Sequence, residues 1–433
     1  MDFALIIIGI FALCFRQAHI AFVVYYALAT NYFYFDRYGI SSFLFPHNIS
    51  DSAFLMFFII ALYGIARNKR YKYELLGKIF PVVFLFGVSI IILLFVDLMH
   101  EGDILSAIKT SRHWIVLFAA YFVLPLFSPD EYYNVIKWML YATVFVSCLI
   151  LSDYFIGTTF KGSHTVAVID TQGNFQRRGA HPAAYASFYL LYLVAYMSKG
   201  QSDWKRWTVC IVLMMTIFLS LTRSMIITQI LSIIAIVVMV NRSNTFKLVQ
   251  TLSVCLVGMM FVPVLFPALG DRLSGSVDEV VQYVATGEKA RKGDGTMAFR
   301  LDHLKERFDY VASNNRTLIF GIGNITEKEF PNIFRIGLFD RNRGRTTQLD
   351  TGDIAWSILI LRLGVIGVIA FCLYWLYALK IFALSSEIIG KVSFVYLLSL
   401  IPLSICSTFV ASGYNWVFVM MLLCLARFQT NLK

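Results

Sequence analysis

The chain has 433 residues, of which 58% are hydrophobic, 16% are aromatic and only 15% are charged. This composition differs from that of soluble domains and includes repeated apolar runs of membrane-span length, so it predicts an all-α, polytopic membrane protein. The formal charge of +11 does not indicate nucleic-acid binding, because Lys and Arg concentrate in short segments between apolar runs, where such residues orient membrane spans.

The apolar runs predict about 12 or 13 membrane helices. They lie near residues 3–15, 18–35, 51–66, 79–98, 113–128, 134–156, 182–198, 207–222, 224–240, 247–267, 354–378, 392–409 and 413–426. Only Arg16 and Gln17 separate the first two runs, so these form either a tight hairpin or one long tilted helix.

The densest basic connection, residues 67–72, is expected on the cytoplasmic side, and alternation then places the later basic connections on the same side. We divide the chain into a transmembrane bundle at 1–267, a large extracytoplasmic loop at 268–353 and C-terminal transmembrane helices at 354–433. All seven cysteines lie in apolar runs, which indicates neither disulfides nor a metal site.

The large loop contains a helical pattern over residues 299–311. Leu301, Leu304, Phe308 and Val311 form one apolar stripe, bordered by Arg300, His303 and Arg307. Such a border is where cations are expected on a helix that lies on a membrane face. After a short apolar run, Gly321 and Gly323 predict a turn; no strand–turn–helix unit surrounds them, so they do not form a dinucleotide motif.

Two arginines are candidates for binding an anion. Arg223 stands between two apolar runs, where it is either an interfacial residue that snorkels to water or part of an anion site. Arg300 is either an ordinary cation of an amphipathic helix or a ligand for phosphate, which guanidinium binds in a bidentate manner. Further arginines on the same side, at 177, 178, 341, 343 and 345, favour an anionic ligand as a group.

Asp353 begins the apolar run that follows the loop, and there it is either a helix N-cap or a catalytic base. Asp350 can share either task, and His181 and His303 are the remaining outer-face candidates for acid–base chemistry. The sequence contains no HExxH, CxxC or Walker motif and no tight acidic cluster outside the membrane, so no metal or cofactor is predicted.

Four sequence features together resemble the bacterial O-antigen ligase and O-antigen polymerase superfamily of membrane glycosyltransferases. In chain order they are the Arg178-Gly179-x-His181-Pro182 helix entry, the Thr222-Arg223-Ser224 helix edge, Phe299-Arg300-Leu301 running to Gly321-x-Gly323, and the helix start that leads to Gly364-Val365-Ile366-Gly367. The resemblance spans roughly residues 175–370. Members of that family often have a histidine at the position that Asp353 occupies here.

The resemblance implies a metal-independent glycan polymerase of the bacterial inner membrane, active on its outer face. The donor would be an oligosaccharide on undecaprenyl diphosphate, whose leaving group Arg223 and Arg300 would neutralise, and Asp353 would act as the base. Substrate binding would fall to Arg178, His181, Arg307 and Asp350. The implied partners are the lipid-linked donor, the bilayer, a chain-length regulator and a flippase.

Two alternatives remain. An O-antigen ligase would transfer the glycan to a lipid A core acceptor, but the missing histidine favours the polymerase. A lipid-linked oligosaccharide transporter would place ionisable groups in the mid-bilayer and would often show paired repeats with broken helices. The sequence pattern indicates none of these transporter features.

Overall fold

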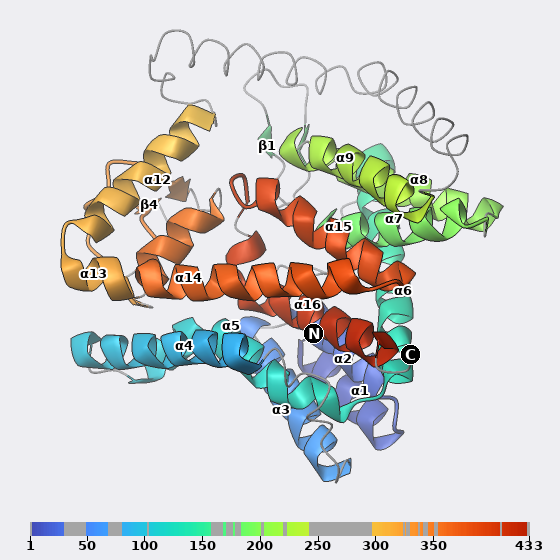
Figure 1. Ribbon diagram of the computed structural model, residues 1–433, viewed down its shortest axis with the longest axis horizontal. Helices are drawn as coiled ribbons and strands as arrows, with labels where there is room; N and C mark the ends of the chain where they lie inside the picture. Colours follow the sequence, from blue (N-terminus) through green and yellow to red (C-terminus); the bar gives the residue numbers. More distant parts are fainter. Residues whose placement is uncertain are drawn as a thin grey trace.

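The computed structural model describes residues 2–29, 49–67, 80–101, 104–156, 168–169, 176–177, 183–200, 203–219, 223–241, 297–323, 325, 330–336, 338–340, 345–349, 354–407 and 409–430. Most of these residues are α-helical, as the composition predicts. The helices are α1 Asp2–Cys14, α2 Ala18–Ala29, α3 Ile49–Arg67, α4 Phe80–Glu101, α5 Ile104–Val123, α6 Pro129–Ile156, α7 Ala183–Ser198, α8 Trp204–Leu219, α9 Arg223–Val240, α12 Met297–Ala312, α13 Asn315–Phe320, α14 Ala355–Leu384, α15 Ile388–Leu403 and α16 Gly413–Thr430 (Figure 1).

Short elements complete the described chain. The 3-10 turns are η4, Leu124–Leu126, and η5, Phe409–Ala411. Two small antiparallel hairpins pair β1, Val168–Ile169, with β2, Gln176–Arg177, and β3, Leu338–Asp340, with β4, Arg345–Thr347. Both hairpins belong to segments predicted to lie outside the membrane.

Each predicted apolar segment within the described residues contains a helix, and only the segment 247–267 lies outside them. At the N-terminus the structure selects the hairpin, because α1 and α2 are separate helices joined by a tight turn. Gln17 N–H donates to Ala12 O and Arg16 N–H donates to Leu13 O, the Schellman pattern that ends a helix. Arg16 occupies the left-handed position of this turn, with φ of 59°, where glycine is usual.

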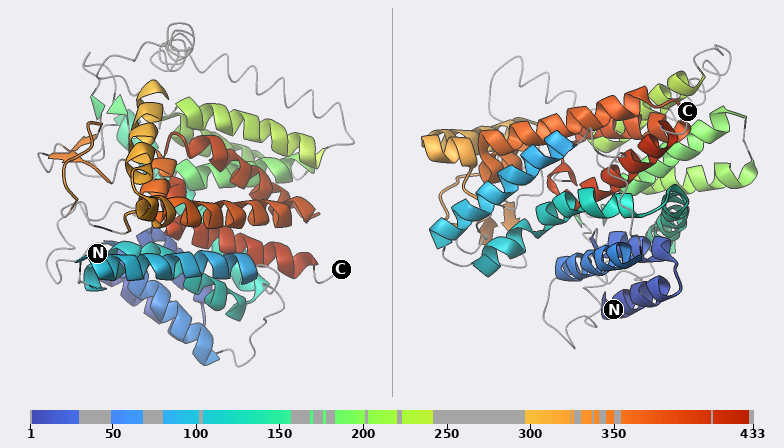
Figure 2. Two further views of the ribbon diagram at one scale, coloured as in Figure 1. Left: turned by 60° about the vertical axis from the view of Figure 1, so that its left-hand side comes forward. Right: turned by 60° about the horizontal axis from the view of Figure 1, so that its bottom comes forward.

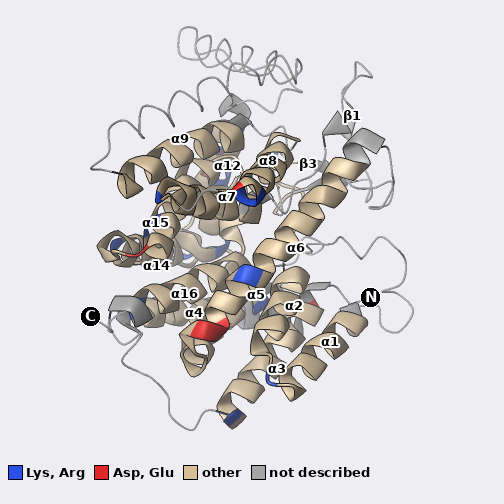
Figure 3. Ribbon diagram, turned by 90° about the vertical axis from the view of Figure 1, so that its right-hand side faces the viewer, with Lys and Arg blue, Asp and Glu red and all other residues tan. Residues whose placement is uncertain are grey.

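Apolar side chains occupy both the interior and much of the outer surface. Residues 416–426 of α16 are all buried, as expected for a helix that is apolar all round. Large apolar side chains are nevertheless exposed on several outer helices, among them Phe15, Ile65, Phe95, Ile211 and Leu376. Charged residues are sparse along the helices (Figure 3). By length and composition, Pro129–Ser152 of α6 and Ala355–Leu384 of α14 could each cross a bilayer.

Helix α14 contains a break that the sequence pattern does not predict. Gly364 has φ of 60° and ψ of −169°, which are not helical values, so a short helix at 355–363 precedes a longer one at 365–384. The carbonyls of Leu361 and Arg362, just before the break, accept from Ile322 N–H at 2.8 Å and Gly323 N–H at 3.3 Å. Backbone groups of the 321–323 turn satisfy the carbonyls beside the break.

The backbone of the turn at Gly321 packs directly against the backbone of the break at Gly364. Gly321 ends α13 with φ of 72°, and a Cβ there would lie 2.3 Å from Arg362 O. A Cβ on Gly364 would in turn lie 2.3 Å from Gly321 N. The predicted turn at 321–323 thus allows the loop backbone to approach α14 closely.

The predicted outer segments gather at one end of the molecule. In Figure 2 (left), α12 crosses the ends of the roughly parallel helices, and both β hairpins lie at that same end. Helix α9 also begins there (Figures 1 and 2), whereas α16 ends at the opposite side of the molecule. The fold therefore gathers segments that are more than 100 positions apart in the sequence.

We expect Gly321→Ala to destabilise the fold by at least about 2 kcal/mol, because the alanine would combine a strained backbone with an overlap against Arg362 O. Thermal unfolding of the detergent-solubilised protein measures the effect. Gly200→Ala is the matched control: Gly200 also has a positive φ, of 88°, but a Cβ there meets nothing within 4 Å. An equal decrease of Tm in the two variants would show that the close approach of Gly321 to α14 contributes nothing to stability.

Candidate functional site at the start of helix α14

The structure describes only some of the residues that the sequence singles out. Arg178, His181, Asp350 and Asp353 lie outside the described residues. Arg223 is the first residue of α9, so it stands at a helix edge as predicted, but its side chain is not described. Arg300 and Arg307 are both on α12, and the structure describes both side chains.

Arg300 points from α12 toward the turn that follows α15. Its Nη1 donates to the Cys406 sulfur at 3.4 Å, and its Nε is buried without a hydrogen bond in the described part of the chain. Sulfur is a weak acceptor, and none of the carboxylates that the structure describes forms an ion pair with Arg300. The half-buried guanidinium therefore retains donors for an anion.

The first residues of α14 are bound to the same turn. Ala355 N–H donates to Ser404 O at 3.1 Å, and Trp356 Nε1 donates to Ser404 Oγ at 2.7 Å. Ser404 and Cys406 are only two residues apart, so this turn contacts both the start of α14 and Arg300. The structure thus brings Arg300 to the helix start that the sequence associates with Asp353.

His303 provides a direct contact between α12 and α14. Its Nδ1 lies 3.0 Å from Ser357 Oγ, and only 2% of the residue is exposed. Burial, together with the positive charge of Arg307, lowers the pKa of His303 to about 3, so the ring is neutral at physiological pH. A neutral, buried imidazole that bonds to a serine suits a positioning role better than the capture of an anion.

Arg307 is almost wholly enclosed, with 1% of its surface exposed. Its Nη1 donates to Glu306 at 2.9 Å, its Nη2 donates to Gln348 O at 3.2 Å, and its Cζ lies 4.1 Å from the centre of the Phe334 ring. Glu306 accepts in addition from the backbone N–H groups of Arg335 and Ile336. These contacts give Arg307 a structural task, since they hold α12 to the segments 330–336 and 348–349.

Two of the three basic residues expected beside the apolar stripe of α12 are buried. We expected Arg300, His303 and Arg307 at the border of a membrane-facing stripe, but His303 and Arg307 are buried, whereas Leu301 and Phe308 are 40% and 47% exposed. The burial of these polar groups is possible because Ser357, Glu306, Gln348 and Phe334 supply partners. The helix buries His303 and Arg307 together with Val311, and it exposes Leu301 and Phe308 together with Lys305 and Asp309.

The outward side of α12 forms an apolar groove with α14. The groove has a volume of about 430 Å³, and its lining residues are Leu301, Leu304, Lys305, Phe308, Trp356, Ile360 and Val368. Lys305 is the single charged residue among them. The groove adjoins the turn of α12 that carries Arg300, so an apolar surface and a cation lie next to each other.

Sequence reasoning missed several members of this site. Ser357, Ser404 and Cys406 sit within or next to apolar runs and carry no motif that would single them out. Their contacts with His303, Trp356 and Arg300 arise only when α12, α14 and α15 pack together. Among the residues that the structure describes, no group of three or more His, Cys, Asp or Glu is placed to hold a metal ion.

Neither a protein-family model nor a curated protein matches this sequence.

We expect the stability of the protein to fall as the pH is lowered from about 7 toward 3. His303 has a pKa of about 3 when folded and 6.5 in the reference state, so in this window the unfolded chain binds the additional proton and unfolding is favoured. At pH 5 this difference in proton binding lowers the free energy of unfolding by about 2 kcal/mol. In thermal unfolding, His303→Gln should show a smaller loss of Tm between pH 7.5 and pH 5, whereas Lys305→Gln, an exposed charge on the same helix, should behave as wild type.

Proposed function

We propose that this protein is an integral-membrane glycan polymerase, which joins oligosaccharide repeat units carried on undecaprenyl diphosphate. The reaction takes place on the outer face of the bacterial inner membrane. The half-buried Arg300 carries this proposal, because its guanidinium has no carboxylate partner among the described residues and lies beside the start of α14. The family resemblance supplies the substrate class.

The distribution of apolar side chains supports a membrane location. Exposed Phe, Ile and Leu side chains on the outer helices suit hydrocarbon, since a water-facing surface rarely carries large contiguous apolar areas. The outward stripe of α12 extends this surface to the end where the predicted outer segments lie. A lipid-linked donor then reaches Arg300 without leaving the bilayer.

The chemistry assigned to the site is metal-independent. Attack of an acceptor hydroxyl on the anomeric carbon expels a diphosphate, and Arg300 and Arg223 stabilise the negative charge that develops on that leaving group. Asp353 accepts the proton of the attacking hydroxyl, with Asp350 as the reserve. Arg178 and His181 bind the substrate, while Arg307 supports the site by fixing α12.

An O-antigen ligase is the neighbouring alternative, and reconstitution separates the two. Purified protein in liposomes that contain only lipid-linked repeat units should extend the glycan, and gel electrophoresis of the products should show a ladder. Product formation that requires a lipid A core acceptor would identify a ligase and overturn the polymerase assignment.

The break in α14 is the observation that favours a transporter, since broken helices line many transport sites. Transporters use the freed carbonyls at such breaks to bind ions. Here the carbonyls of Leu361 and Arg362 accept instead from the backbone of Ile322 and Gly323. The break thus serves the docking of the loop, and the enzymatic proposal accounts for it better.

We expect Arg300→Lys to lose most of the polymerase activity although the charge is kept, because lysine cannot bind phosphate oxygens in a bidentate manner. A loss of at least 100-fold corresponds to about 2.7 kcal/mol of transition-state stabilisation. Chain-length distribution in the liposome assay measures the effect. Arg316→Lys, at an exposed position on α13, is the matched control. A normal product ladder from Arg300→Lys would show that Arg300 does not stabilise the diphosphate leaving group.

Asp353→Asn should abolish glycan transfer while it preserves donor binding, because the amide keeps the shape and can still cap a helix but accepts no proton. Donor binding is measured with a fluorescent undecaprenyl diphosphate analogue, and transfer is measured in the same preparation. An active Asn variant would assign Asp353 to helix capping alone.

A further inference from the structure

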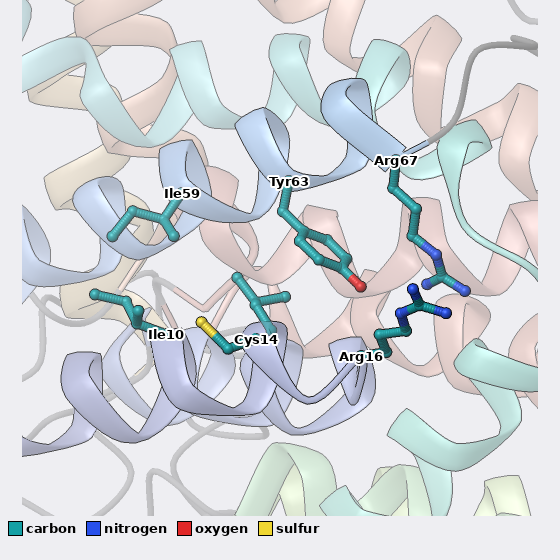
Figure 4. Close-up of a pocket in the computed structure, with 7 residues that line it drawn as sticks. Ile10, Cys14, Arg16, Ile59, Tyr63 and Arg67 are labelled. Atoms are coloured by element: carbon teal, nitrogen blue, oxygen red, sulfur yellow. The ribbon is translucent and has the colours of Figure 1, made fainter.

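A second pocket lies between α1 and α3, and its charges are not used by the proposed reaction. Its volume is about 520 Å³, and its lining residues are Ile10, Leu13, Cys14, Arg16, Ile59, Tyr63 and Arg67. Figure 4 shows the Tyr63 hydroxyl and the guanidinium groups of Arg16 and Arg67 converging at one end of the pocket. The other end is apolar.

This polar end carries more positive than negative charge. Arg67 pairs with Glu131 at 2.6 Å, and its Cζ also lies 5.9 Å from the centre of the Tyr63 ring. Glu131 is further engaged by Ser128, whose backbone N–H donates to it at 2.8 Å. Arg16 forms no ion pair in the described part of the chain, so of the two guanidinium groups at this end only that of Arg67 is paired with a carboxylate there.

Arg16 has a backbone conformation that a residue with a long side chain rarely adopts. Arg16 occupies the left-handed position of the Schellman turn between α1 and α2, with φ of 59°. Glycine fits that position without strain, whereas a long side chain there is unfavourable. The guanidinium group of Arg16 points toward that of Arg67 (Figure 4), an arrangement that an anion between the two would stabilise.

The surroundings indicate which kind of anion fits. The apolar part of the pocket is lined by Ile10, Leu13 and Ile59, and exposed apolar side chains such as Phe11 of α1 and Leu62 of α3 lie elsewhere on the same two helices. A ligand with both a phosphate and a hydrocarbon chain satisfies both ends at once. A free anion would leave the apolar end unoccupied.

We propose that this pocket binds one anionic phospholipid, with its phosphate between Arg16 and Arg67 and an acyl chain along Ile10, Leu13 and Ile59. The Tyr63 hydroxyl donates to the phosphate, and Arg16 binds two of its oxygens. The lipid bridges the α1–α2 turn and the end of α3, so it holds the N-terminal hairpin against the rest of the molecule.

This lipid is distinct from the lipid-linked donor. The ion pair with Glu131 places the pocket near the beginning of α6, whereas the end of α6 leads toward the β1–β2 hairpin. From Glu131 to Ile156 the helix is about 38 Å long. The pocket therefore lies at the opposite end of α6 from the segments predicted to be on the outer face, and the proposal does not depend on the glycosyl-transfer reaction.

The test uses the full-length protein, purified in a neutral detergent and stripped of lipid. Phosphatidylglycerol, phosphatidylcholine and inorganic phosphate are each titrated while Tm is recorded, and native mass spectrometry counts the bound lipids. We expect phosphatidylglycerol to raise Tm with one tightly bound lipid, while phosphatidylcholine and inorganic phosphate have little effect. An equal response to phosphate alone would overturn the lipid assignment in favour of a small-anion site.

Arg16→Asn is the variant for this test, because asparagine tolerates the left-handed backbone and removes the cation. We expect at least a 10-fold weaker response to phosphatidylglycerol, and Arg16→Lys should lie between Asn and wild type. Lys205→Asn, at an exposed position outside the pocket, is the control and should respond as wild type. An unchanged lipid response in folded Arg16→Asn would overturn the proposal.

Discussion

The backbone contact between Gly321 and Gly364 determines how the loop helices meet the rest of the molecule. Each glycine occupies space that a Cβ would otherwise fill, and the adjacent N–H groups of Ile322 and Gly323 satisfy carbonyls beside the break in α14. Because the contact is made by backbone, it sets the position of α13 and thereby of α12 within a narrow range. The contacts of His303 with Ser357 and of Arg300 with Cys406 both depend on this position.

The orientation of α12 links stability to the proposed chemistry. An amphipathic helix in water would bury its whole apolar stripe, but here Leu301 and Phe308 of the stripe face outward, whereas Val311, His303 and Arg307 are buried. Such an arrangement is favourable when hydrocarbon covers the stripe and the protein supplies partners for the polar groups. Arg307 has those partners in Glu306 and Gln348, whereas the hydrogen bond of Arg300 within the described part of the chain goes to the Cys406 sulfur. The difference distinguishes a structural arginine from one available to a ligand.

Arginines at two places in the molecule are proposed to bind phosphate in different contexts. Arg300 is half-buried next to the α12–α14 groove, where its role is to stabilise a leaving group. Arg16 and Arg67 lie at the α1–α3 pocket, where the proposed lipid is retained and not transformed. In both places an apolar surface adjoins the cations, which is the combination that an amphiphilic phosphate requires.

The sequence by itself determined the helical class and the approximate positions of most of the described helices, because runs of apolar residues are a local property that packing rarely changes. It also identified the helix at 297–312 and the turn at 321–323, since periodicity and glycine spacing are local signals. Only the tertiary structure decided which side of α12 faces inward, that α14 breaks at Gly364, and that Ser357, Ser404 and Cys406 belong to the site. These features depend on contacts between residues far apart in the chain. No local pattern records such contacts, because the partners that stabilise a buried arginine or a freed carbonyl come from other helices.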